Sequence, residues 1–137
     1  MKIKNTDRTR LQKNPKISIE RLNNKEMVFS FKDFDHTQGQ TFLVWEENKL
    51  LHLLLEKMKE YSHKTLIDAQ KAYFTIYGSF PTNSQFKYPR HISEDAIWAS
   101  LHIQGKECII GHIIDNIFYT VFLDKEHQFW PTEKKHT

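Results

Sequence analysis

Three β-prone runs follow one another in the C-terminal third of the chain, and only short turns separate them. The runs cover residues 97–103, 108–114 and 117–124. Gly105-Lys106 suits a two-residue turn with glycine at the first central position, and Asp115-Asn116 suits a turn with positive φ at both central positions. Strands joined this tightly pair antiparallel, so the region predicts a three-stranded meander.

The two turns also predict how the three strands align. Ile103 should lie opposite Cys108 and Ile114 opposite Ile117, and every other pair follows by counting outward from the turns. In this register one face is almost wholly aliphatic and suits a covering helix. A row of small side chains should cross the other face and leave a furrow between larger neighbours: Ser100, Gly111 and Thr120.

A helical periodicity occupies the middle of the chain. Apolar residues recur at three- and four-residue steps, which predicts an amphipathic helix over residues 41–60. A second, short helix is expected over residues 62–70, with Thr65 or Ser62 as its N-cap. Residues 72–77 are strand-like, and a polar, proline-containing connection follows over residues 81–93.

The N-terminal part is strongly basic. Residues 1–25 hold eight basic and two acidic side chains, whereas the remaining residues hold twelve basic and fifteen acidic ones. We expect residues 1–15 to form a flexible basic arm, which is either simply solvated or binds nucleic acid through its phosphates. Residues 16–22 and 27–34 are β-prone runs around an Asn-rich turn and predict a hairpin.

Together these elements predict one α+β domain over residues 16–137, behind the basic arm. Two helices should pack on one face of an antiparallel sheet that ends in the meander. Cys108 is the only cysteine, which excludes a disulfide within the chain and fits a reducing compartment. No apolar run approaches the roughly 20 residues that span a bilayer, so we expect a cytoplasmic protein without membrane contact.

The sequence contains none of the common catalytic signatures. It has no P-loop, GxGxxG, HExxH, CxxC or GxSxG motif, and no cofactor is expected. Histidine is the residue type that changes charge near neutral pH, so histidines near the sheet are the candidates for proton transfer. His127 follows the last strand and His102 lies at the rim of the predicted furrow. His112 should instead be buried between Ala99 and Tyr119, hydrogen-bonded to a tyrosine or to backbone.

The segment after the last strand has more than one interpretation. Asp124 precedes His127 by three residues and could orient it for acid–base chemistry. Asp124 and His127 could also bind a metal together with a third ligand such as His102. The same segment suits a structural turn from which Phe129 and Trp130 fold back onto the core.

The element order resembles that of the RelE/ParE-like toxin superfamily. The resemblance covers about residues 27–130 and rests on a strand or hairpin, two helices and a closing meander. It also rests on the runs Gly-Lys-Glu-Cys-Ile-Ile-Gly-His-Ile and Phe-Tyr-Thr-Val-Phe-Leu-Asp-Lys-Glu-His. It implies helices on one face of the sheet and a concave opposite face that binds RNA or a target.

Ribosome-dependent members of that superfamily cut mRNA with basic residues on the sheet and a C-terminal His or Tyr. His127 falls in a comparable place. The chain departs from the pattern where an arginine would be expected, because Cys108 and Ile109 occupy that stretch and no arginine lies beyond Arg90.

The resemblance implies an RNA-directed toxin, which is an mRNA endoribonuclease or an inactive relative of one. His102 and His127 would transfer protons, and five further side chains would contact RNA: Lys87, Arg90, Trp98, Lys106 and Lys125. The ribosome and a cognate antitoxin-like protein would be its partners. The alternative is a non-enzymatic binding module of a toxin–antitoxin or phage-defence system, which uses the aromatic sheet face or a free sheet edge.

Overall fold

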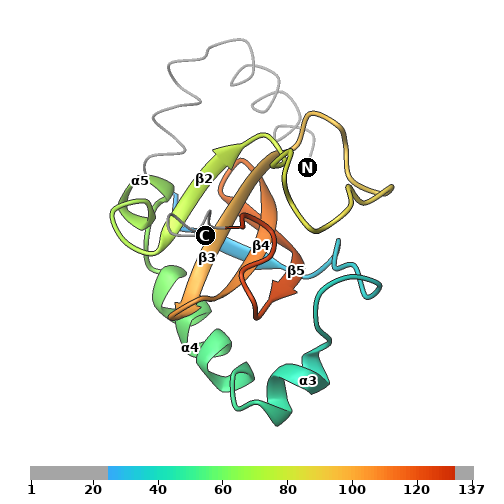
Figure 1. Ribbon diagram of the computed structural model, residues 1–137. Helices are drawn as coiled ribbons and strands as arrows, with labels where there is room; N and C mark the ends of the chain where they lie inside the picture. The colour runs from blue at the N-terminus through green and yellow to red at the C-terminus, as the bar shows by residue number, and fades with distance from the viewer. Residues whose placement is uncertain (1–24, 132–137) are drawn as a thin grey trace, which may run out of the picture.

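Residues 25–131, which the computed structural model describes, form a five-stranded sheet with three helices (Figure 1). In chain order the elements are β1 (Val28–Ser30), α3 (Phe42–Glu47), α4 (Leu51–Tyr61), α5 (Leu66–Ala69), β2 (Phe74–Gly78), β3 (Ile97–Gln104), β4 (Glu107–Ile114) and β5 (Ile117–Asp124). The strands lie in the order β1-β5-β4-β3-β2. Only β1 and β5 pair in parallel, so the expected α+β class is confirmed.

The basic arm, residues 1–15, and the first strand of the predicted hairpin, residues 16–22, lie outside the described residues. The second half of that hairpin contributes β1, which is only three residues long and pairs with β5. Within the described part of the chain, no helix is long and apolar enough to cross a membrane.

The helix predicted over residues 41–60 is two helices, α3 and α4. Lys49 interrupts it by adopting a φ of 61°. The N–H of Lys49 donates to the carbonyl of Glu46, and that of Leu50 donates to the carbonyl of Trp45. These two bonds form the Schellman motif that ends many helices. Glycine usually occupies the left-handed position and so marks the end of a helix in the sequence. A lysine gives no such mark, and the apolar periodicity continues past it.

The second predicted helix, residues 62–70, is the short α5. Of its two candidate caps, Thr65 is the N-cap, because its side chain accepts a hydrogen bond from the N–H of Asp68. The Ser62 hydroxyl instead donates to the carbonyl of Met58 and so closes the end of α4.

A β-bulge at Ile103 changes the alignment of β3 with β4. The turn at Gly105-Lys106 forms as predicted, but His102, and not Ile103, lies opposite Cys108. The predicted pairing of Ile103 with Cys108 is therefore wrong by one residue, and each side chain of β4 lies on the opposite face from the one expected. Bulges of this kind redirect side chains and are frequent next to functional sites.

The alignment of β4 with β5 begins as predicted, with Ile114 opposite Ile117. Asp115 has positive φ in the turn between them, but Asn116 does not, so the turn differs from the expected type. A second bulge lies in β5, because Gly111 of β4 faces Thr120 whereas its neighbour Ile110 faces Phe122.

The bulge at Ile103 removes the predicted furrow. Gly111 lies beside Ala99 and Thr120, not beside Ser100, and this row of small residues is on the side that the helices cover. The ring of Phe118 fills the space above it, because a Cβ added to Gly111 would meet that ring at 2.9 Å.

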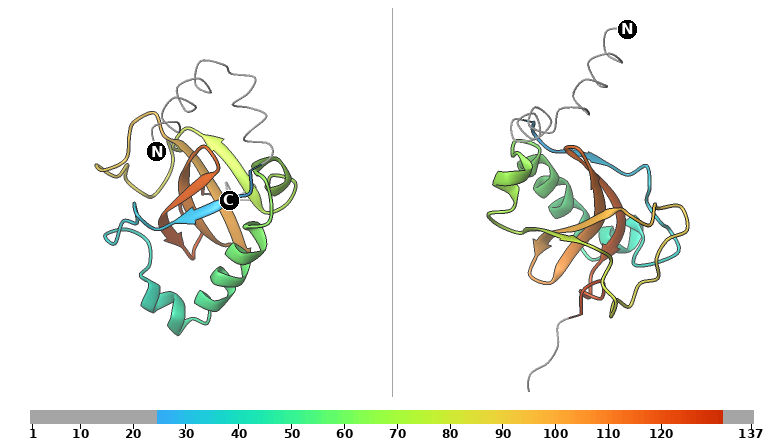
Figure 2. Two further views of the ribbon diagram at one scale, coloured as in Figure 1. Left: turned by 180° about the vertical axis from the view of Figure 1, so that it is seen from behind. Right: turned by 90° about the horizontal axis from the view of Figure 1, so that it is seen from above.

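Both faces of the sheet are buried. The helices cover one face, where they form the helix-side core of Trp45, Leu54, Tyr61, Leu101, Ile109 and Phe118 with their neighbours. The connector, residues 79–96, crosses the other face together with the C-terminal segment, residues 125–131. Figure 2 shows the helices and the connector on opposite sides of the strands. The connector-side core consists of Phe86, Ile92, Trp98, Cys108, Ile110, Val121, Phe122 and Phe129. The open concave face expected from the resemblance is therefore covered.

Candidate functional site

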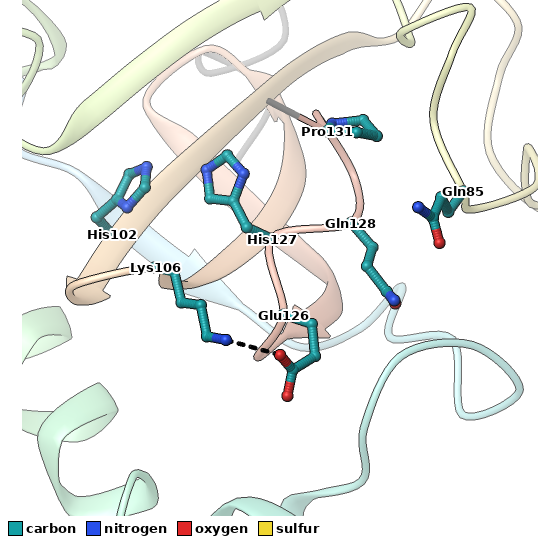
Figure 3. Close-up of a pocket in the computed structure, with 7 residues that line it drawn as sticks. All are labelled: Gln85, His102, Lys106, Glu126, His127, Gln128 and Pro131. Atoms are coloured by element: carbon teal, nitrogen blue, oxygen red, sulfur yellow. Dashed lines mark hydrogen bonds and ion pairs between the residues drawn. The ribbon is translucent and has the colours of Figure 1, made fainter. Parts of the chain in front are cut away.

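His102 and His127 lie side by side at one end of the sheet. They are 25 positions apart in the sequence, and their ring centroids are 5.3 Å apart with an angle of 33° between the ring planes. His102 projects from β3 next to the bulge at Ile103, and His127 follows β5. Figure 3 shows the two imidazoles adjacent to each other, with Gln85 on the far side of Gln128. The two proton-transfer candidates chosen from the sequence are thus neighbours in the fold.

Asp124 builds the turn that carries His127. One carboxylate oxygen accepts the N–H of Gln128 at 2.9 Å, and the other accepts the N–H of Phe129 at 2.8 Å. The Phe129 ring is fully buried in the connector-side core, which anchors the far end of this turn. Asp124 is therefore a structural residue, as the turn interpretation of this segment proposed.

The metal-binding alternative finds no support in the described residues. No three His, Cys, Asp or Glu side chains among them come close enough to hold a metal ion. Both carboxylate oxygens of Asp124 accept backbone hydrogen bonds, and the side chain is buried. Burial also raises the pKa of the Cys108 thiol, so this cysteine is not a reactive thiolate.

The hydrogen bonds of the two imidazoles define their free nitrogens. Nδ1 of His102 lies 3.1 Å from the carbonyl oxygen of Gly105. A carbonyl oxygen only accepts, so Nδ1 of the neutral ring carries the hydrogen and Nε2 is left with a free lone pair. His127 adopts a φ of 59°, and its Nδ1 is buried without a hydrogen-bond partner in the described chain. Strained backbone and unpaired buried polar atoms are enriched at functional sites, which makes His127 a candidate.

The histidines face an open pocket of about 830 Å³. Besides the two imidazoles, its lining residues are Gln85, Lys106, Glu126, Gln128 and Pro131. The Lys106 ammonium lies 2.8 Å from the Glu126 carboxylate, and the Lys125 ammonium lies 2.9 Å from it. These hydrogen bonds, first that of Lys106 and then that of Lys125, lower the pKa of Glu126 to about 2. Lys106 and Glu126 of the pocket thus form an ion pair, and Lys125, which is not a lining residue, shares the same carboxylate.

The other predicted RNA contacts lie elsewhere. Lys87 and Arg90 are on the connector and line a separate depression of about 580 Å³. Trp98 has no exposed surface and packs among the rings of Phe80, Phe122 and Phe129. The prediction that Trp98 offers a stacking surface to RNA is therefore wrong in this structure.

Sequence reasoning missed the two glutamines of the pocket. Gln85 and Gln128 come together because the N–H of Gln85 donates to the carbonyl of Gln128 at 3.0 Å. Gln85 belongs to the connector, which has no helical or strand periodicity. Gln128 could have been found from its position, because it directly follows His127 in the turn that begins at Asp124.

His112 differs from the histidines of the pocket. It is buried, as predicted, and its Nε2 lies 2.8 Å from a carboxylate oxygen of Asp33. Its ring stacks on Tyr119 at 5.0 Å, but Trp98, and not Ala99, lies opposite it on β3. The predicted hydrogen bond to a tyrosine or to backbone is replaced by this carboxylate.

The contact with His112 stabilises the charged form of the Asp33 carboxylate. Partial burial raises the pKa of Asp33, but the hydrogen bonds with His112 and Lys32 outweigh that effect and hold it below its ordinary value. The pair joins β4 to the segment that follows β1, which is a structural task.

Backbone strain is unevenly distributed. Four non-glycine residues of the described chain have positive φ: Lys49, Tyr73, Asp115 and His127. Lys49, Tyr73 and Asp115 lie in turns between regular elements. His127 lines the pocket, and the carbonyl of Tyr73 accepts the N–H of His102 at 2.9 Å. Two of the four strained residues therefore belong to the surroundings of the histidine pair.

Comparisons of the chain with models of known protein families, with curated proteins and with solved structures found no match.

Proposed function

We propose that this chain is an RNA-directed endoribonuclease of the RelE-like kind, which acts in the cytoplasm and uses His102 and His127 to transfer protons. The observation that carries the proposal is the pair of imidazoles, 5.3 Å apart, in an open pocket beside Lys106. The order of a first strand, helices and a run of antiparallel strands also agrees with the resemblance.

The chemistry needs no metal ion. The 2′-hydroxyl of RNA attacks the adjacent phosphorus, so the O2′–P bond forms while the P–O5′ bond breaks. The products are a 2′,3′-cyclic phosphate and a 5′-hydroxyl. A general base removes the proton from O2′, and a general acid delivers one to O5′. His102 suits the base because its Nε2 is free, and His127, on the facing turn, would be the acid.

Lys106 would supply the positive charge. Negative charge builds on the non-bridging phosphate oxygens in the transition state, and a preorganised cation stabilises it. The ion pair of Lys106 with Glu126 lies at the surface, where such pairs contribute little stability. A phosphate can therefore replace Glu126 as the partner of Lys106. In this proposal lysines take the place of the arginine that the family pattern would have on the sheet.

The test is RNA cleavage by the purified chain, with and without ribosomes and in the presence of a metal chelator. His127→Gln and His102→Gln should each lower the rate about 10²–10⁴-fold without changing the thermal midpoint. His63→Gln is the matched control, since this histidine is exposed in the turn after α4. Because the mechanism needs one protonated and one neutral imidazole, the rate should pass through a maximum with pH. A wild-type chain that leaves RNA intact under all these conditions overturns the proposal.

A second candidate function is the binding of an antitoxin-like or phage-defence protein. The aromatic face expected to serve this purpose is covered by the connector, so the candidate surface is the β1 edge of the sheet. Among the described residues no strand lies on the outer side of β1. Val28 of β1 and Ile114 of β4 are about half exposed, and Ile117 of β5 lies between them in the register. An extended partner segment could add to this edge.

The partner proposal is tested with the product of the adjacent gene, since toxins and antitoxins are encoded together. Size-exclusion chromatography of the two co-expressed proteins should give a complex that Val28→Lys disrupts. The substitution should leave RNA cleavage intact, because Val28 lies outside the pocket. A complex that survives Val28→Lys would place the partner on another surface.

A further inference from the structure

Two depressions meet at His102. One is the pocket shared with His127. The other, of about 430 Å³, is lined by Lys57, Tyr73, Ile103, Gln104 and Gly105 as well as His102. Because His102 lines both, a chain molecule that enters the first depression and continues into the second passes this residue.

Tyr73 is the unusual residue of the second depression. Its side chain is 64% exposed although it is a large aromatic residue. Its backbone has a φ of 63°, and its carbonyl is bound to the N–H of His102. A bulky residue at positive φ is uncommon, and such strain is concentrated at ligand-binding positions. Tyr73 lies in the turn that joins α5 to β2, and its exposed ring contributes little to the core.

Lys57 adds a positive charge over one face of this ring. Its ammonium lies 5.0 Å from the centre of the Tyr73 ring. Its acidic neighbour is Glu60, at 3.7 Å on the same helix; the Lys57 side chain is 20% exposed and that of Glu60 54%. An exposed aromatic ring next to a lysine is the combination that binds single-stranded nucleic acids, through base stacking and phosphate contact.

We propose that the second depression binds the nucleotide next to the cleaved phosphodiester, with its base stacked on Tyr73 and a phosphate near Lys57. This inference rests on the proposed function and extends it from a cleavage site to a substrate class, namely extended single-stranded RNA. A base inside a duplex is stacked on its neighbours and offers no free face to the ring, so duplex RNA does not fit.

The experiment measures binding separately from cleavage. Full-length chain is titrated into a fluorescein-labelled 2′-O-methyl RNA hexamer, which lacks the attacking hydroxyl, and fluorescence anisotropy is recorded. Tyr73→Leu should weaken binding about 5- to 150-fold, which is the range for loss of one stacked base. Tyr73→Phe is the matched control and should bind within about twofold of wild type, because it keeps the ring. Lys57→Gln should lower the salt dependence by about one phosphate contact.

Each outcome decides between the two proposals. Binding that depends on Tyr73, in a chain that cleaves no RNA, supports the nucleic-acid site and overturns the ribonuclease. Cleavage that depends on His127 but is unaffected by Tyr73→Leu, for dinucleotides and hexamers alike, overturns the second depression as a subsite. Equal binding of duplex and single strand also overturns it. No binding of the hexamer by the wild-type chain overturns it as well, whatever the cleavage assay gives.

Discussion

The two faces of the sheet are buried by different kinds of structure. On one face, α3, α4 and α5 place apolar side chains at helical spacing over the strands. On the other face, the connector and the C-terminal segment have no regular hydrogen-bonding pattern, yet Trp98, Phe122 and Phe129 are as completely buried as the helix-side residues. An irregular segment can thus complete a core when it supplies enough aromatic side chains.

This difference decides where a substrate can bind. An uncovered sheet face would leave a concave surface for RNA, as the family resemblance implies. Because the connector fills that surface, the candidate site lies at the end of the sheet, at His102 and His127. The four predictions that follow test whether each side is a true core and whether the polar pair of His112 and Asp33 is structural.

Phe129→Ala should have the largest effect. Phe129 has no exposed surface, and removing a buried phenyl ring costs about 3–5 kcal/mol. The turn that carries His127 should also loosen, since its far end is anchored by this ring. Urea denaturation measures the loss. A change below about 1 kcal/mol would mean that the C-terminal segment merely lies on the surface, and the comparison of two cores would fail.

Leu54→Ala tests the helix side in the same way. Leu54 is fully buried between α4 and the sheet, so the substitution should cost about 2–5 kcal/mol. Leu55→Ala, on the exposed face of the same helix, is the control and should change stability by less than about 0.5 kcal/mol. Equal effects of the two substitutions would show that the helix packs by a different face.

His112→Ala should cost about 1.5–3 kcal/mol, which is the range for a hydrogen bond to a charged group. The double variant with Asp33→Ala should lose less than the sum of the two single variants, because each removes the same contact. Thermal or chemical unfolding of the four proteins gives the coupling. Strictly additive losses would exclude the pair as the link between β4 and the segment after β1.

The pH dependence of stability should show the smallest effect. The pKa of Asp33 is lower in the folded chain than its ordinary value, so the unfolded chain binds the proton more readily. The stabilisation is therefore present above about pH 4 and declines as the pH falls below that value. Asp33→Asn should flatten this part of the curve of unfolding free energy against pH. An unchanged acid limb would assign the effect to other carboxyls.

The sequence identified the regular part of the fold well. The bounds of β3 and β4 lie within one residue of the predicted runs, and those of β5 agree, because β-branched residues and short turns mark the three strands. The bulge at Ile103 and the helix break at Lys49 escaped prediction. Both depend on tertiary packing or on a residue in an uncommon conformation, and neither position carries glycine.

The candidate site was only partly predictable. His102 and His127 were chosen for their chemistry and their position near strand ends, and the structure brings them together. The register used to choose His102 was wrong, but the error changed the face of the β4 side chains and not that of the β3 side chains. His102 therefore stays on the side away from the helices, as expected. Gln85 and the burial of Trp98 could not be foreseen, because both depend on the path of the connector.

The positive φ of four non-glycine residues has a consequence for engineering the chain. Glycine adopts this conformation without a steric penalty, so Lys49→Gly and Asp115→Gly are candidates for raising thermostability without touching the pocket. The same replacement would relieve the backbone equally at the other two positions, but it would remove the Tyr73 ring from the second depression or the His127 imidazole from the histidine pair. The first two positions thus offer a gain in stability alone, whereas the other two would show a trade-off between stability and activity.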